Sequence, residues 1–471
     1  MKKTMILKYL QNIAGIFCSR ILGLIRDILV ARFLGAGVFS DIFVLILQMP
    51  SLFRRVFAEG AFSQSFLPHL KIMDDKGRFC VKVILTLGFM AFILCLIAAI
   101  FPRVLLLLFA SGFSDEMLLM AQDLVRISFW FLFFIFFISF LSALLNYEHK
   151  FFIASFSYSF FNLGCILALL LFKDEDKLYI LHKVAVFIII SAILQTVFLC
   201  FFLRKNEILF SFFKNLKNYF KIKNTGTFFK KFTQASFGAS AMQLSTILDT
   251  QIASYLAVGG ISYLYYANRI YLLPLALIAT AFSQVIFSRF IHSDEQNRQY
   301  LLTKGLEMMC SLLILAALGG IYLSDFIIFL IFEGGSFTRT DTFACSLVLQ
   351  GFLLALPAAG INRLLISDLA ASNRQGELAL ISFLHLFLNL ILALALAFQM
   401  GVLGLALAHA LSAYLMSFVY IFKLGKKRFL ASIRPKFWLA FGAFVLLYAF
   451  LLRLLGQWLT SNLDLLKGMF C

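Results

Sequence analysis

Charged residues are scarce in this sequence. Asp, Glu, Lys and Arg make up 14% of its 471 residues, whereas soluble domains average about 25%. Hydrophobic residues reach 62%, above the usual share of about 45–50%. No polar stretch is long enough to form a large soluble domain. The shortage of charge therefore excludes an ordinary soluble protein and indicates a membrane protein.

Motifs for metal binding, redox chemistry and nucleotide hydrolysis are also missing. The eight cysteines are scattered, mostly within apolar runs, and no Cys-x-x-Cys spacing occurs. We interpret them as packing residues and expect neither a disulfide nor a metal site. There is no glycine-rich phosphate loop, and the polar groups within the apolar runs form no nucleophile–base pair. We therefore expect neither an enzyme nor a bound cofactor.

Long apolar runs take the place of these motifs. Runs of about 20 residues, enough to cross a hydrocarbon core of about 30 Å, recur along the whole chain. We expect an all-α polytopic membrane protein with about thirteen spans. The predicted spans are 6–35, 38–70, 80–101, 118–145, 152–172, 183–203, 232–258, 263–290, 299–323, 342–371, 376–398, 401–422 and 434–454.

The net charge of +18 is concentrated in alternate connections between these spans. Such positive-inside asymmetry predicts a cytoplasmic N-terminus. The basic connections also favour contact with anionic membrane lipids. A nucleic-acid partner is not expected, because the sequence has no soluble basic domain.

The longest interior connection divides the chain into two halves. We expect an N-lobe at 1–203, a basic cytoplasmic linker at 204–231, a C-lobe at 232–428, and a final span with a short tail at 429–471. Pro50 and Pro274 occupy similar offsets in the two halves, as do the similar segments 162–169 and 389–394. This pattern suggests two pseudo-symmetric six-helix lobes, a recurrent transporter plan, with a cavity between them.

Arginines within the predicted spans are the main candidates for a site. An ionised side chain near the bilayer centre costs at least about 2.5–3.5 kcal/mol, so it must face water, a counter-charge or an anionic ligand. The four arginines in question are Arg20, Arg26, Arg54 and Arg269.

Ion pairing explains only part of this set. Asp27 shares a helix face with Arg20, and Arg55 and Glu59 have the i,i+4 spacing of an ion pair. For Arg26, Arg54 and Arg269 we favour an anionic ligand, because the guanidinium fork fits phosphate oxygens in a bidentate manner. The predicted substrate is a phosphate-bearing headgroup in a cationic cavity.

A second polar group lies in the predicted C-lobe spans. It comprises Asp249, His385, Asn389 and His409. One interpretation is hydrogen bonding between helices. The other is a site for a coupling cation, with the two histidines favouring protons over Na⁺. The driving force would then be a proton or sodium gradient, or the membrane potential.

Several segments resemble a known family. Residues 19–27, 33–37 with Asp41, and 50–68 are similar to the opening of MurJ (MviN) proteins, and 265–269 with Pro274 and 404–408 are similar to later segments. These are lipid II flippases of peptidoglycan synthesis, in the multidrug, oligosaccharidyl-lipid and polysaccharide (MOP) exporter superfamily, which has a MATE-like fold. The resemblance places these residues at the family's functional positions: Arg20, Arg26, Asp41, Arg54, Glu59, Ser262 and Arg269.

The chain departs from the family pattern at three places. Asn268 stands where the family usually has an acidic residue before the span-8 arginine, and the segment 333–337 lacks the family's arginine. The family has fourteen spans, the last two of which are thought to form a groove for the lipid tail. After the thirteenth predicted span only 453–471 remain, so the fourteenth is truncated or the groove is reduced.

The resemblance implies a transporter of the bacterial cytoplasmic membrane. It would move lipid II from the inner to the outer leaflet by alternating access, as a monomer, near the cell-wall synthesis machinery. Three alternatives stay open. They are a flippase for another polyprenyl-pyrophosphate-linked oligosaccharide, a cation-coupled drug or metabolite antiporter with an acidic cavity, and a non-transporting scaffold in which Arg26 and Arg269 tolerate alanine.

Overall fold

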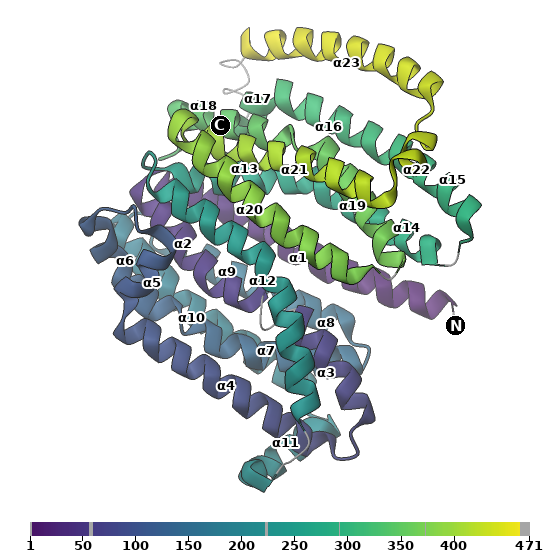
Figure 1. Ribbon diagram of the computed structural model, residues 1–471. Coiled ribbons are helices and arrows are strands. Elements are labelled where there is room, and N and C mark those ends of the chain that lie inside the picture. Colours follow the sequence, from purple (N-terminus) through teal and green to yellow (C-terminus); the bar gives the residue numbers. More distant parts are fainter. Residues whose placement is uncertain (1, 56–59, 222–224, 292, 373, 462–471) are drawn as a thin grey trace. The chain divides into compact units, whose positions relative to one another are not determined.

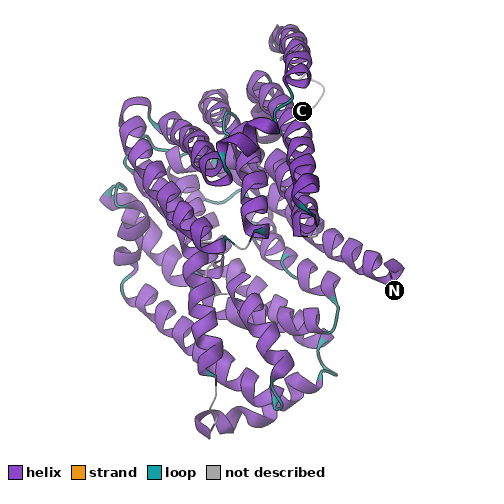
Figure 2. Cartoon of the chain, turned by 45° about the vertical axis from the view of Figure 1, so that its right-hand side comes forward, coloured by secondary structure: helices purple, strands orange, loops and turns teal. Residues whose placement is uncertain are grey.

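The computed structural model describes residues 2–55, 60–221, 225–291, 293–372 and 374–461. Within these ranges all regular structure is helical, apart from one isolated bridge between Gly334 and Phe337. Figure 2 shows the helices and the short loops that join them. The predicted all-α class is confirmed.

The chain divides into two compact units, Met1–Ile247 and Leu248–Cys471. The division falls inside one long helix, α12, rather than in the predicted linker at 204–231. The lobe limits given above stay a prediction.

The first unit is built from helices joined by short turns (Figure 1). They are α1 (Lys2–Leu34), α2 (Val38–Phe53), α3 (Gly60–Ile72), α4 (Lys76–Ile100), α5 (Pro102–Ala110), α6 (Asp115–Ser128), α7 (Phe131–Tyr147), α8 (Phe151–Phe156), α9 (Ser159–Leu171), α10 (Lys177–Phe202), α11 (Glu207–Asn215), η2 (Leu216–Lys221) and α12 (Gly226–Ser254). Side chains of Asp75, Ser114, Asp176 and Asn206 cap helix N-termini, as expected for these residue types.

Small residues bring the helices of the first unit close together. The helix α1 packs against α8 and α9, and α10 packs against α9 and α7. A Cβ atom on Gly164 would lie 2.7 Å from the Cβ of Ser191, so this glycine sets the α9–α10 distance. Such small-residue contacts are typical of helix packing in membranes.

The second unit has the same construction. Its helices are α13 (Gly260–Pro274), η3 (Leu275–Thr280), α14 (Ala281–Ile291), α15 (Glu295–Gly305), η4 (Leu306–Cys310), α16 (Ser311–Tyr322), α17 (Ser324–Phe332), α18 (Arg339–Leu353), α19 (Leu356–Ala371), α20 (Gln375–Met400), α21 (Val402–Leu424), α22 (Lys426–Ala431) and α23 (Pro435–Ser461). Helix α21 packs against α20, α19 and α18, and α23 contacts α16. The segments η3 and η4 are single π-helical turns, which often occur at functional sites.

Ten helical segments in the described ranges are long and apolar enough to cross a membrane. They coincide with ten of the predicted spans. The other three predictions, 6–35, 38–70 and 232–258, do not meet this criterion, although Val38–Phe53 is a shorter apolar helix. These three segments contain Arg20, Arg26, Arg54 and Asp249. Helix α2 is apolar but only 16 residues long, whereas α1 and α12 are long enough but do not meet the limits on hydropathy or charge. The exact span count stays a prediction.

Large apolar side chains are exposed in rows along individual helices. On α20, for example, Leu380, Leu384, Phe387 and Ile391 are all at least 49% exposed. Rows of this kind are rare on a soluble monomer but suit a surface in contact with lipid. Backbone groups in these segments are paired within helices, as a bilayer requires.

Candidate functional site

Arg26 lies in a buried polar cluster of the first unit. The residue is 4% exposed, and its Nη2 atom lies 2.7 Å from Oδ1 of Asp27. The Nη1 atom donates to Oδ1 of Asn162 on α9 at 2.9 Å. Asn162 in turn donates to the carbonyl of Ser19, and the Arg26 guanidinium lies 5.8 Å from the Phe161 ring centre. The cluster joins α1 to α9, so the structure gives Arg26 the pairing that the sequence suggested for Arg20.

Arg54 is half-buried at the end of α2, four residues after the helix-bending Pro50. It lines a small cavity of about 10 Å³ with Ser139, Tyr158, Phe161 and Gln195, about the volume that holds one water molecule. Phe161 therefore contacts both arginine environments, with Arg26 over its ring and the Arg54 cavity beside it.

The other predicted site residues of the first unit are placed differently. Arg20 and Arg55 are exposed, and Asp41 is 2% exposed in the first turn of α2. A carboxylate there is favoured by the helix dipole. Glu59 lies outside the described residues, so the Arg55–Glu59 pair stays a prediction.

Arg269 in the second unit is held by a tyrosine one helical turn earlier. Its Nη2 atom donates to the Tyr265 hydroxyl at 2.7 Å, and its guanidinium carbon lies 4.7 Å from the centre of the Tyr265 ring. This half-buried arginine lies on α13, which begins after Gly259 at φ 87° and contains the fully buried Ser262 in its first turn. Pro274 ends α13 directly before the π-turn η3.

Asp249, in the part of α12 that belongs to the second unit, takes part in a hydrogen-bond chain with residues of α20 and α21. Asn389 on α20 donates to Oδ1 of Asp249 on α12 at 3.2 Å. Ser412 on α21 donates to Oδ1 of Asn389 at 3.2 Å, and its hydroxyl lies 3.3 Å from Nε2 of His385. Three of the four predicted residues are thus brought together by a serine that is 0% exposed.

His409 does not extend this chain with its imidazole. Its ring packs against Tyr271 and Phe352, with Nε2 3.5 Å from the Tyr271 hydroxyl. Only its backbone carbonyl accepts a hydrogen bond from Ser412. Within the described ranges, no three His, Cys, Asp or Glu side chains gather as a metal site.

Sequence reasoning missed three residues that organise these clusters: Asn162, Tyr265 and Ser412. Asn162 and Ser412 are polar residues within apolar runs, the same signal that selected Asn389. Tyr265 precedes Arg269 by four residues, a spacing that places two side chains on one helix face.

Comparison with known proteins settles the family. A family model described as "Lipid II flippase MurJ" matches residues 30–465. The chain belongs to the MurJ family. Proteins named "Probable lipid II flippase MurJ" from Helicobacter pylori and Aquifex aeolicus are similar to it. The Helicobacter protein is 39% identical over 449 residues, which are 91% of this chain and 97% of the relative. The Aquifex protein is 30% identical over 85% of this chain and 79% of the relative.

Solved structures agree with membership of the MurJ family. A lipid II flippase MurJ in an inward closed conformation aligns with a TM-score of 0.77 and 27% identity, over 97% of this chain and 99% of that one. An inward-facing MATE multidrug transporter of the MOP superfamily aligns at 0.67 with 15% identity, over 88% and 95% of the two chains. The MATE likeness shows a shared fold alone. MurJ is a transporter family, so the protein is not an enzyme.

Proposed function

We propose that this protein moves lipid II from the inner to the outer leaflet of the bacterial cytoplasmic membrane by alternating access. The observation that carries the proposal is that Arg269, in a chain of the MurJ family, is held in one orientation by Tyr265. Tyr265 fixes the orientation of the guanidinium by a hydrogen bond and by ring contact. A fork held in this way is ordered before a phosphate arrives, which lowers the entropy lost on binding.

The arginines have different roles in this proposal. Arg54 and Arg269, each half-buried, bind the pyrophosphate of the headgroup, while the polyprenyl tail stays in lipid. Arg20, Asp41 and Ser262 belong to the same pathway as lining groups. Arg26 fixes α1 against α9 through Asp27 and Asn162 and keeps the first unit rigid.

The proposed orientation places the N-terminus in the cytoplasm. Support comes from the basic residues that flank helix ends on one set of connections, such as Lys76, Arg204, Lys426 and Lys427. The protein works as a monomer, close to the enzymes that make and use lipid II.

Complementation with a leaflet assay tests the flippase proposal. The resident lipid II flippase of a bacterial host is depleted, and wild type, Arg269→Ala or Arg103→Ala is expressed. Arg103 is an exposed arginine paired with the exposed Asp115, which makes it a matched control. We expect wild type and the control to restore lipid II on the outer leaflet, and Arg269→Ala to fail at equal membrane levels.

Two outcomes contradict parts of the proposal. No restoration by a well-inserted wild type indicates another polyprenyl-pyrophosphate-linked oligosaccharide as substrate. Equal rescue by wild type and Arg269→Ala leaves the flippase assignment standing and removes this arginine from the pathway.

We further propose that Asp249, Asn389, Ser412 and His385 form the coupling-cation site, with a proton as the cation. The support is the continuous hydrogen-bond chain from α12 through α20 to α21. Such a chain lets a proton taken up at the Asp249–Asn389 end change the packing of three helices at once. His409 acts next to the site, by packing against Tyr271.

Reconstitution in liposomes with an imposed gradient tests this site. Ser412→Ala is compared with Ser417→Ala, a serine on the same helix that bonds Asn362 instead. We expect lipid II movement by wild type and Ser417→Ala to accelerate with a proton gradient, and Ser412→Ala and Asp249→Asn to lose that response. An unchanged response in both variants, or a response to sodium alone, contradicts proton coupling here.

A further inference from the structure

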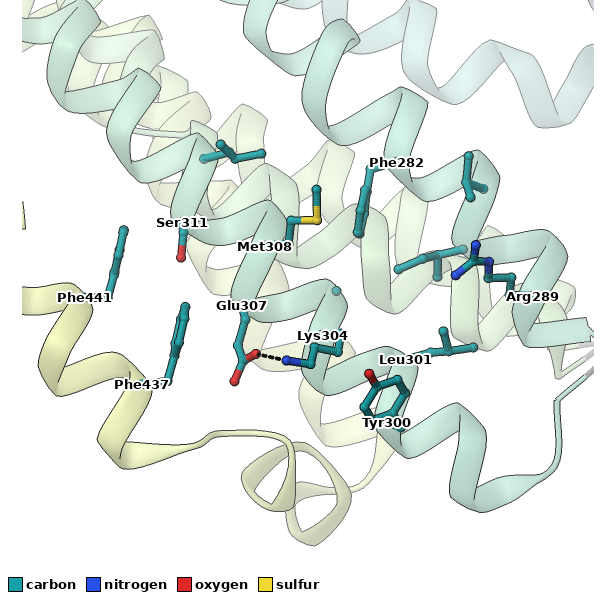
Figure 3. A pocket seen from close by; sticks show the side chains of 14 residues that line it. Phe282, Arg289, Tyr300, Leu301, Lys304, Glu307, Met308, Ser311, Phe437 and Phe441 are labelled. Atoms are coloured by element: carbon teal, nitrogen blue, oxygen red, sulfur yellow. Dashed lines mark ion pairs between the residues drawn. The ribbon is translucent and has the colours of Figure 1, made fainter.

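A groove of about 700 Å³ lies between α23 and the segment α14 to α16 in the second unit (Figure 3). Its volume is in the range of about 300–1,000 Å³ that is usual for ligand pockets. Its walls are mainly apolar. The apolar lining includes Phe282, Ile286, Met308, Leu312, Phe437 and Phe441.

Helix α23 forms one wall of this groove and buries very few of its residues against the rest of the unit. Only 6% of the most apolar 18-residue window of α23 is buried, although the helix contacts α16 (Figure 1). Met308, on the opposite wall, is 55% exposed. Because water is a poor solvent for such walls at membrane depth, an apolar molecule from the bilayer fills the space more favourably.

One end of the groove is cationic. Arg289 lies in the last turn of α14 and Lys304 in the last turn of α15, and both line the groove. No ion pair joins the exposed Arg289 to any residue in the described part of the chain. Figure 3 shows Lys304 paired with Glu307 and beside Tyr300, with Arg289 farther along the groove, on the side away from Phe437 and Phe441.

The single carboxylate at the groove is already neutralised. Glu307 is 4% exposed, lies 3.5 Å from Lys304 and forms a bidentate ion pair with Arg434. Two cations, Lys304 and Arg434, therefore pair with one carboxylate. With Arg289 also lining the groove, this part of it keeps an excess of positive charge. An anionic group is favoured there, and a neutral or cationic one is not.

We propose that this groove binds an anionic diacyl phospholipid. An acyl chain lies between α23 and α16, and the phosphate contacts Arg289 and Lys304. A cationic part of the groove with an apolar slot leading away from it matches the two parts of such a lipid. In the orientation proposed above this end is cytoplasmic, the leaflet that carries anionic lipids. The charge match itself does not depend on that orientation.

Native mass spectrometry of the full-length protein tests the proposal. The protein is equilibrated with equal amounts of dioleoyl phosphatidylglycerol and dioleoyl phosphatidylcholine, and the lipids retained are counted. We expect wild type to retain phosphatidylglycerol preferentially. The double variant Arg289→Gln/Lys304→Gln should retain about tenfold less, because each basic group near an anionic lipid contributes to binding. Lys427→Gln removes a charge from α22, outside the groove, and should bind like wild type.

A second variant separates the apolar slot from its charge. Met308→Trp fills the groove without changing charge and should lower phosphatidylglycerol retention to a similar extent. Phosphatidylglycerol should also raise the unfolding temperature of wild type and Lys427→Gln, because a ligand that binds only the folded protein stabilises it. It should not raise the unfolding temperature of the two groove variants. Arg269→Ala should bind phosphatidylglycerol normally, so a failure of the flippase proposal leaves this result unaffected.

Three results overturn the proposal. The first is equal phosphatidylglycerol retention by wild type and both groove variants. The second is loss of undecaprenyl phosphate but not of phosphatidylglycerol in these variants, which assigns the groove to a polyprenyl chain. The third is a dimer cross-linked through Phe441→Cys, which shows that a second copy covers the groove.

Discussion

At the scale of single residues, burial separates arginines that the sequence presents as equivalent. Arg26 is 4% exposed and bonded to Asp27 and Asn162, whereas Arg20, on the same helix, is exposed. A buried charge that loses its partner is expensive, and an exposed one is not. Loss of function on mutation of Arg26 therefore reports destabilisation of the fold, whereas loss of function on mutation of Arg20 does not.

We predict that Arg26→Ala destabilises the protein by about 3–5 kcal/mol, because Asp27 and Asn162 lose their buried partner. Arg20→Ala should change stability by less than about 0.5 kcal/mol. Thermal unfolding of the purified variants measures both. Equal unfolding temperatures for Arg26→Ala and wild type contradict the structural role assigned to Arg26.

Tyr265 offers a milder test of the substrate arginine. Tyr265→Phe keeps the ring under Arg269 but removes the hydroxyl that accepts its hydrogen bond. A hydrogen bond of this kind contributes about 1.5–3 kcal/mol, so we expect lipid II flipping to fall by about tenfold or more at unchanged protein levels. Tyr322→Phe, on α16, is the control. Normal flipping by Tyr265→Phe shows that Arg269 needs no fixed orientation.

At the scale of elements, glycines decide which helices touch. Gly404 lies in the first turn of α21, three residues after Gly401, which turns the chain at φ 61°. A Cβ atom on Gly404 would lie 2.2 Å from the carbonyl oxygen of Leu396 on α20. The α20–α21 pair carries His385, Asn389 and Ser412, so this contact also sets the geometry of the polar chain.

We predict that Gly404→Ala separates α20 from α21 and lowers stability by about 1–3 kcal/mol, the usual cost of overpacking. Gly376→Ala, near the start of α20 and with no atom within 4 Å of the added carbon, is the matched control. Unfolding temperature measures stability, and the proton-gradient response reports on the polar chain. A Gly404→Ala variant with a normal unfolding temperature and a normal proton-gradient response contradicts the role of Gly404 in the α20–α21 contact.

At the scale of the whole molecule, the two candidate phosphate ligands belong to different compact units. Arg54 lies in the first unit and Arg269 in the second. Under the proposed function each of these arginines is needed to bind the headgroup, so neither can replace the other. Residues that act on the same group in this manner give strongly non-additive effects.

We therefore predict that Arg54→Ala and Arg269→Ala each abolish flipping and that the double variant is no worse than either. Lipid II accessibility on the outer leaflet measures all three, at equal protein levels. Two partial defects that multiply in the double variant show instead that the arginines act on separate steps.

The sequence by itself determined the membrane class, most of the spans and the family. Hydropathy is a sum over consecutive residues, so a run such as that of α4 or α10 identifies a span without knowledge of its neighbours. The motif segments around Arg20, Arg54 and Arg269 likewise need no tertiary information, because a family pattern is a pattern of residues along the chain.

Only the tertiary structure decided which polar groups meet. Arg26 and Asn162 are 136 residues apart, Asp249 and Asn389 are 140 apart, and Arg434 and Glu307 are 127 apart. Which faces of two helices touch depends on their rotation and tilt, and these are set by packing along their full length. For the same reason, neither Ser412 at the centre of the polar chain nor the residues that line the groove beside α23 were foreseen from the sequence.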